Sequence, residues 1–202
     1  MKPTRQQELI LDYDGNSVVI AAPGSGKTFV LSQKIKKNLK LLLEHQGIIA
    51  ISYTNKASNE LKSRSLSNGE KPKGSFFGTI DKFNLSEIII PFAKHLFGTS
   101  DYDFQIVKHS SIENKEDEVE NFEWIDRKLK LEEIDQNKID ILKHYFKQGI
   151  ILIETIGVFA DYVFSNSIAC QKYIKSRYKF IYIDEYQDSG HEQHQIFIKI
   201  TY

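Results

Sequence analysis

A glycine-rich loop that ends in a lysine and a threonine is the first stretch of this chain suited to chemistry. It comprises Ala21, Ala22, Pro23, Gly24, Ser25, Gly26, Lys27 and Thr28, and we call it the phosphate loop. Glycines let the backbone turn its N–H groups inward around a polyphosphate, and a helix that starts there adds its positive end. The lysine is then expected to reach the β- and γ-phosphates, and the threonine hydroxyl to bind magnesium. All eight residues are therefore predicted to bind ATP.

One position of the phosphate loop departs from the pattern G-x-x-x-x-G-K-[ST]. That pattern has glycine where this chain has Ala21. A Gly/Ser turn between a strand and a helix would give a similar string, so the loop alone leaves both interpretations open.

An acidic pair far along the chain provides the second half of such a site. The apolar run 181–183 is followed by Asp184 and Glu185. Asp184 is predicted to complete the magnesium site opposite Thr28, while Glu185 orients and deprotonates the attacking water. An ordinary charged turn after a strand is the alternative. The long separation between Thr28 and Asp184 predicts an inserted domain between the two halves.

Alternating strands and helices must position these groups. We expect helices at 4–13, from the phosphate loop to about 44, and at 56–66, and strands at 17–21, 48–53, 76–79 and 180–183. This alternation predicts an α/β fold with a parallel sheet covered on both faces. Four lysines of the second helix are expected on its solvent side: Lys34, Lys36, Lys37 and Lys40.

Residues 85–175 follow a different pattern. They are charged and almost free of proline, with short apolar repeats, which predicts a mostly helical insertion. The domain prediction is therefore a discontinuous nucleotide-binding domain, 1–84 and 176–202, with the insertion between its parts.

Composition limits the class of protein. The 202 residues carry no net charge, so no global field indicates a nucleic-acid partner. Residues 1–75 hold 12 Lys and Arg against 6 Asp and Glu, whereas residues 101–140 hold 6 against 13. This favours a basic face near the phosphate loop and an acidic accessory segment, which a solvated helix explains equally. Cys170 is the one cysteine, and no signal or membrane-spanning segment is recognised, so a cytoplasmic protein without a membrane partner is expected.

Four motifs in order resemble those of UvrD/Rep-type superfamily 1 DNA helicases. Residues 184–188 match D-E-[FY]-Q-D, and residues 52–57 with Glu60 and Arg64 match T-F-T-N-K-A-x-x-E-[ML]-x-x-R. Residues 78–83 are similar to a T-[FI]-H-S-F element with Asp81 at the histidine position, and Gln7 lies where that family has its adenine-reading glutamine.

The resemblance implies a fold and site residues. The nucleotide-binding domain would be a RecA-like P-loop NTPase domain 1A, here incomplete, and the insertion a subdomain 1B. ATP and Mg²⁺ are the implied cofactors. The implied catalytic residues are Lys27, Glu185 and Gln187. The implied DNA contacts are Tyr53, Thr54, Asn55, Lys56, Thr79 and Phe83. A core position for the Tyr53 ring is equally compatible with the sequence.

The resemblance also implies a longer protein. Members of that family continue into a second RecA-like domain that supplies arginine fingers. The present chain is therefore expected to be the N-terminal part of an ATP-dependent helicase or single-strand DNA translocase. Its expected substrate is single-stranded or partly duplex DNA. Residues 78–98 and 173–189 are similar to the helicase-like B subunits of Gabija antiviral systems, which implies a companion nuclease and a role against phage. The alternative is a nucleotide-gated interaction subunit that docks on a nuclease without motor activity. A P-loop kinase would leave the element at 52–57 unexplained.

Overall fold

The computed structural model describes residues 3–22, 24–67, 69–100, 102–112, 131–185 and 191–201. The chain divides into two compact units. The first unit is Met1–Thr79 with Ser176–Gln187, and the second is Ile80–Lys175 with Asp188–Tyr202. The backbone therefore passes between the units three times.

A parallel sheet forms the centre of the first unit. Its strand order is β2 (Phe76–Gly78), β1 (Gly47–Ile51), β5 (Tyr178–Ile183), and β1 is parallel to both neighbours. The middle strand is buried along its whole length, as an apolar run in a parallel sheet should be. The predicted mixture of helices and parallel strands is thus confirmed.

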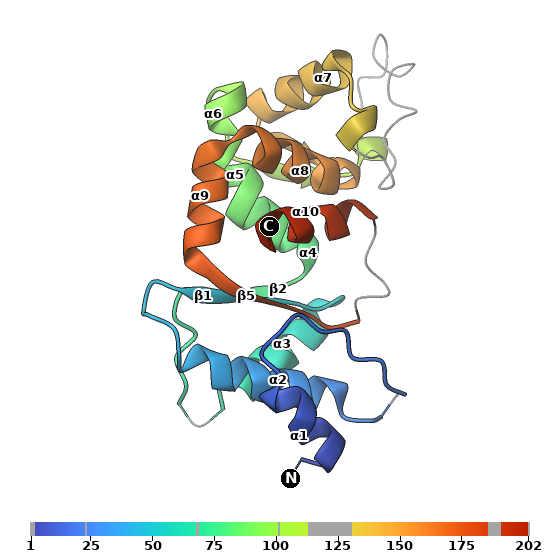
Figure 1. The fold of residues 1–202 in the computed structure, drawn as a ribbon. Helices are drawn as coiled ribbons and strands as arrows, with labels where there is room; N and C mark the ends of the chain where they lie inside the picture. Colours follow the sequence, from blue (N-terminus) through green and yellow to red (C-terminus); the bar gives the residue numbers. More distant parts are fainter. Residues whose placement is uncertain are drawn as a thin grey trace. The chain divides into compact units, whose positions relative to one another are not determined.

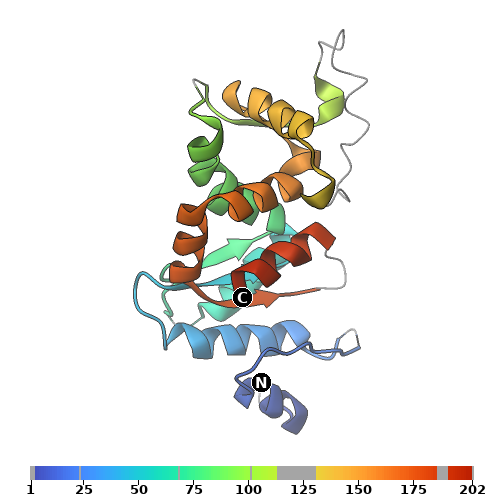
Figure 2. The ribbon, with the colours of Figure 1, turned by 45° about the horizontal axis from the view of Figure 1, so that its top comes forward.

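In the described residues of the first unit, three helices accompany this sheet. Helices α2 (Lys27–Leu39) and α3 (Asn55–Ser65) lie together on one face, and α1 (Arg5–Asp12) lies against α2 (Figures 1 and 2). Helical spacing turns one side of α2 and α3 toward the sheet. The core between these layers contains Ile35, Leu39, Leu42, Ile48, Ala50 and Leu61.

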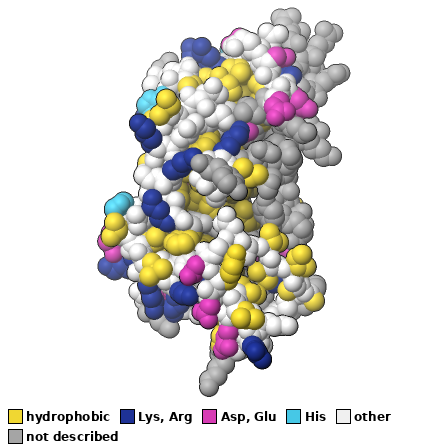
Figure 3. Space-filling model, in the orientation of Figure 1, with side chains coloured by type: hydrophobic (Ala, Val, Ile, Leu, Met, Phe, Trp, Pro, Cys, Tyr) yellow, Lys and Arg dark blue, Asp and Glu magenta, His cyan; other side chains and the backbone are white. Residues whose placement is uncertain are grey.

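The strand predicted at 17–21 does not form. Residues 17–22 have no helix or strand assignment, and the Ile20 side chain is 94% exposed. A strand exists only through pairing with a neighbour, and the sheet of the described residues contains β2, β1 and β5 alone. The β-branched run Val18–Ile20 therefore leads into the phosphate loop without strand pairing. Over the first unit, hydrophobic side chains are visible among basic and acidic ones (Figure 3).

The second unit consists largely of helices in its described residues. Its α-helices are α4 (Ile80–Phe83), α5 (Ile90–Phe92), α6 (Lys94–Phe97), α7 (Gln136–Lys147), α8 (Ile156–Asn166), most of α9 (Ile168–Arg177) and α10 (His191–Thr201). Asn84–Ile89 is a π-helix that packs against α8. Strands β3 (Gln105–Val107) and β4 (Ile150–Leu152) form a short parallel ladder that the sequence did not predict.

Aromatic rings fill the core of the second unit. Phe97 stacks on Phe159 with 5.3 Å between ring centroids and meets Phe146 edge-on at 6.0 Å. Helix α10 packs against α8, and its Phe197 ring lies 6.2 Å from that of Phe83. The helix that follows the acidic motif thus belongs to the second unit.

The described residues of this unit include a partly buried ion pair and a buried thiol. The Lys199 ammonium of α10 lies 2.5 Å from the Asp161 carboxylate of α8, whose side chain is 4% exposed. Burial raises the pKa of the Cys170 thiol to about 12, so this cysteine is an unreactive core residue. Within the described residues, no helix has the length and apolar character needed to cross a membrane.

Candidate functional site

The phosphate loop turns into α2 through two glycines with left-handed backbone. Gly24 has φ 77° and Gly26 has φ 85°, a conformation that costs other residues free energy. The Ser25 N–H donates to the Ala22 carbonyl at 3.2 Å and closes the turn. Helix α2 then begins at Lys27 without a side-chain cap on its first N–H groups, and an uncapped helix N-terminus is a site for anions.

The Lys27 ammonium is held within the same loop. It donates to the Ala21 carbonyl at 3.1 Å, so the lysine side chain folds back over the turn it follows. This carbonyl is a neutral acceptor, and a phosphate oxygen would be a stronger, charged partner for the same ammonium. Of the predicted loop residues, Pro23 lies outside the described residues.

The two distant halves of the predicted site lie together. Thr28 Oγ1 donates to Asp184 Oδ2 at 3.3 Å, although the residues are 156 positions apart. The sheet produces this proximity, because β5 ends beside β1 and the Asp184 N–H extends their ladder by donating to the Ile51 carbonyl at 2.9 Å. A hydroxyl and a carboxylate are oxygen ligands of the type that Mg²⁺ takes, with nucleotide and water completing its shell. The residues present therefore fit a magnesium–nucleotide site.

The environment of Asp184 alters its acidity. Partial burial raises the pKa of this carboxyl above its ordinary value, and the nearby Glu185 charge raises it further. The hydrogen bond from Thr28 and the positive charge of Lys27 act in the opposite direction. The effect of burial prevails, so the pKa of the Asp184 carboxyl is raised overall.

Glu185 follows with a positive φ of 56° and an exposed side chain. A left-handed backbone at a residue other than glycine is uncommon and concentrates at functional positions. Asp184 and Glu185 form a turn directly after β5. Gln187, the third predicted catalytic residue, lies outside the described residues.

Comparison with protein families identifies the group to which this arrangement belongs. Residues 3–149 match the family model described as the UvrD/REP helicase N-terminal domain. The chain belongs to the UvrD/Rep helicase family. The match includes the phosphate loop and the element at 52–57, and the acidic motif lies C-terminal to it.

Three bacterial relatives of this UvrD/Rep chain are longer proteins. The chain is 34% identical to the Gabija protein GajB of Bacillus cereus over 95% of its own residues and 35% of that protein. It is 27% identical to a probable DNA helicase II homolog of Rickettsia conorii over 92% of its residues and 33% of the relative. A segment of 59 residues, 29% of the chain and 5% of the relative, is 39% identical to the exonuclease/helicase protein RexA of Lactococcus lactis. The chain thus spans about a third of the first two relatives.

Gln7 lies against the phosphate loop. Its Nε2 donates to the Ser25 carbonyl at 3.1 Å, and its Oε1 accepts from the Thr4 N–H at 3.0 Å in a capping box. A Cβ on Gly26 would lie 3.0 Å from Gln7 Nε2. The side-chain amide that the UvrD/Rep resemblance assigns to adenine is therefore next to the first turn of α2, with both of its polar atoms engaged.

The predicted DNA contacts divide into two groups. Tyr53, Thr54, Asn55 and Lys56 are exposed where β1 ends and α3 begins, and the Tyr53 side chain is 70% exposed, which excludes a core position for it. Thr54 caps α3 by accepting from the Ala57 N–H at 3.1 Å.

The remaining two predicted contacts are less accessible. Thr79 is half-buried at the end of β2. Phe83 is fully buried in the second unit against Phe197, which leaves its ring no surface for DNA.

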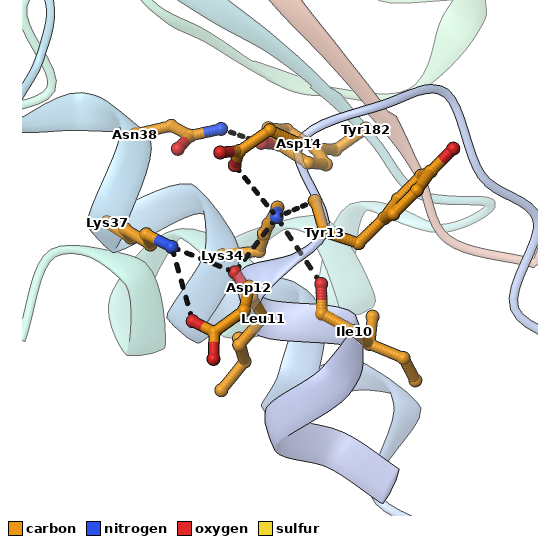
Figure 4. A network of polar contacts seen from close by, with 9 residues as sticks. All are labelled: Ile10, Leu11, Asp12, Tyr13, Asp14, Lys34, Lys37, Asn38 and Tyr182. Atoms are coloured by element: carbon orange, nitrogen blue, oxygen red, sulfur yellow. Dashed lines mark hydrogen bonds and ion pairs between the residues drawn. The ribbon is translucent and has the colours of Figure 1, made fainter.

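Sequence reasoning missed a polar network between α1 and α2. Lys34 was expected on the solvent side of its helix, but its side chain is only 13% exposed and its ammonium lies among backbone carbonyls that follow Leu9 (Figure 4). Lys37 is half-exposed and joins the same network. No local sequence signal distinguishes Lys34 from Lys36 on the same helix, because the fold decides which ammonium meets the end of α1.

Proposed function

We propose that this chain binds Mg–ATP and forms the nucleotide-binding part of an ATP-dependent DNA helicase or single-strand DNA translocase. The observation that carries the proposal is the 3.3 Å contact between Thr28 and Asp184. It brings two oxygen ligands together beside a glycine turn and an uncapped helix N-terminus. A nucleoside triphosphate with its magnesium ion is the ligand that needs all of these features at one place.

Each residue of the site has a proposed task. Mg–ATP would supply the terminal phosphoanhydride bond that is cleaved. Lys27 would leave the Ala21 carbonyl and neutralise phosphate charge, and Thr28 and Asp184 would hold the metal. Glu185 would take a proton from the attacking water, a task for which a carboxylate at the end of a strand is suited.

DNA is proposed to contact the exposed segment Tyr53–Lys56. In a parallel sheet, the carboxyl ends of neighbouring strands meet at one edge, so this segment and Asp184 lie at the same edge of the first unit. Asn55 and Lys56 offer polar and charged groups to phosphates, and the exposed Tyr53 ring is available for stacking on a base. Binding of nucleotide and of DNA at one edge is what a translocase requires. Thr79 and Gln187 are retained as proposed site residues.

A companion nuclease and a role in anti-phage defence are the finer part of the proposal. Likeness to the Gabija protein GajB and to the exonuclease/helicase protein RexA supports them. The proposal also includes a RecA-like domain 1A formed by 1–84 and 176–202, a 1B-like insertion at 85–175, and a cytoplasmic location.

Two substitutions in the full-length protein test the proposal. Lys27→Ala should abolish ATP binding without unfolding, whereas Lys36→Ala on the same helix, whose ammonium binds the Ser67 carbonyl at 2.9 Å instead, should leave it unchanged. Glu185→Gln should keep ATP affinity and lose DNA-stimulated hydrolysis. Equal ATP affinity in the Lys27 variant and the native protein would refute the nucleotide site. ATP-dependent nuclease binding without hydrolysis or translocation by the native protein would establish the gated interaction subunit in place of the motor.

A further inference from the structure

Helix α1 has little apolar anchorage of its own. It has eight residues, none of them fully buried, and Leu9 and Tyr13 expose most of their side chains. So short a helix is unstable by itself. Its position beside the phosphate loop therefore depends on specific polar contacts.

Lys34 of α2 provides most of those contacts. Its ammonium donates to the carbonyls of Ile10 at 3.3 Å, of Leu11 at 2.9 Å, and of Tyr13. It also lies 3.6 Å from the Asp14 carboxylate. Carbonyls at a helix C-terminus lack partners within the helix and carry partial negative charge. The largely buried Lys34 ammonium therefore provides three carbonyls at the end of α1 with a charged donor (Figure 4).

Neighbouring residues support the same junction. Lys37 donates to the Leu11 carbonyl at 3.1 Å and lies 3.5 Å from the Asp12 carboxylate. One turn beyond Lys34 on α2, the buried Asn38 donates to the Tyr182 hydroxyl of β5 at 2.5 Å. The helix that holds α1 is thus itself fixed to the sheet.

The other end of α1 meets the phosphate loop through Gln7, which donates to the Ser25 carbonyl. Lys27 and Lys34 are seven residues apart, close to two helical turns, and so lie on one face of α2. Gln7 and Lys34 therefore both connect α1 to α2. Gln7 makes its contact where α2 starts, and Lys34 makes its contacts two turns further along. Loss of the Lys34 contacts leaves α1 held by the neutral Gln7 hydrogen bond and by the more exposed Lys37, which contacts the Leu11 carbonyl and the Asp12 carboxylate.

We propose that Lys34 is a positioning residue for base selection: by capping α1 it holds Gln7 at the phosphate loop, where the glutamine amide selects adenine. This inference rests on the proposed function, since it assigns a role within the same nucleotide site. It separates two properties of that site. Lys27 and Thr28 determine triphosphate affinity, whereas Lys34 determines the preference for adenine and does not contact nucleotide.

The test compares Mg–ATP, Mg–GTP and inorganic tripolyphosphate binding to the full-length protein by calorimetry. Lys34→Met should reduce the preference for ATP over GTP about tenfold or more, the effect of losing two neutral hydrogen bonds to the base. Tripolyphosphate affinity should stay the same. Lys36→Met is the matched control, and Lys34→Arg should restore the preference. Gln7→Ala should show the same loss, and adding Lys34→Met to it should change nothing further.

The possible results separate the two proposals. A native protein that binds none of the three ligands overturns the proposed function, and this inference with it. A native protein that binds tripolyphosphate but does not distinguish ATP from GTP overturns this inference alone. Unchanged base preference in Lys34→Met, or an equal loss of all three ligands, likewise overturns it.

Discussion

Replacement of Gly26 by alanine probes the geometry of the phosphate loop most directly. Gly26 has φ 85° and ends the loop, and an added Cβ would lie 3.0 Å from Gln7 Nε2. Gly69 is a matched control in the same unit. Its φ is 81°, and nothing lies within 4 Å of an added Cβ. The two substitutions thus impose the same backbone strain, and only the first disturbs the site.

The expected loss of folding free energy can be worked out for both variants. A left-handed alanine costs about 1–2 kcal/mol, offset by about 0.4–1 kcal/mol because alanine restricts the unfolded chain. Gly69→Ala should therefore destabilise by about 1 kcal/mol. Gly26→Ala also pushes the Gln7 amide away from the Ser25 carbonyl and weakens their hydrogen bond, which adds up to about 1.5 kcal/mol. For a chain of this size, each kcal/mol lowers the melting temperature by about 2–4 °C.

Thermal unfolding measures the stability of the two variants, and ATP titration measures their affinity for nucleotide. Both variants should melt below the native protein, Gly26→Ala by the larger margin. Only Gly26→Ala should lose ATP affinity, by about tenfold or more, because its Cβ displaces Gln7 and strains the turn whose N–H groups face phosphate. Native ATP affinity in Gly26→Ala, or an equal loss of affinity in Gly69→Ala, would refute this account of the loop.

Two further predictions concern charged groups. The Asp184 carboxyl has a raised pKa in the folded state, so between its unfolded and folded pKa values the folded chain binds more protons and stability falls as pH rises. Asp184→Asn should therefore melt at or above the native temperature at neutral pH while losing Mg-dependent ATP binding, and native Mg–ATP affinity should fall in weak acid. Lys199→Met leaves the buried Asp161 without its cation and should destabilise the chain by about 2 kcal/mol in urea unfolding, a cost that a second substitution, Asp161→Asn, should largely remove.

Each of these predictions has a clear contrary result. A lower melting temperature for Asp184→Asn at neutral pH would show that its carboxylate stabilises the fold. Equal stability of the Lys199 single variant and the double variant would show that the ion pair carries no coupling.

The proximity of the phosphate loop and Asp184 was predictable, because the local sequence patterns at both places agree with the sheet that the chain forms. The apolar run before Asp184 predicts a strand, which the structure has as the partly buried β5, and a phosphate loop requires a carboxylate near Thr28. The 3.3 Å contact between them follows from the pairing of β5 with β1. Apolar periodicity likewise identified α2, α3, β1, β2 and β5 to within a few residues.

Features that depend on partners distant in sequence were not predictable. Val18–Ile20 has the composition of a strand, but composition cannot supply the neighbour with which a strand pairs. Lys34 is indistinguishable in sequence from Lys36, because only the fold decides which ammonium meets the end of α1. The π-helix at 84–89 and the β3–β4 ladder also arise from packing that no local pattern encodes.

The assignment of α10 to the second unit has a practical consequence for protein engineering. Excising residues 85–175 as one cassette would remove Asp161 and the rest of α8, yet leave Ile196, Phe197 and Ile200 on the remaining piece. Three buried apolar side chains and one lysine would then lose their packing surface at once. A graft between relatives should therefore transfer α10 together with the insertion, and a chimera that leaves it behind is expected to aggregate.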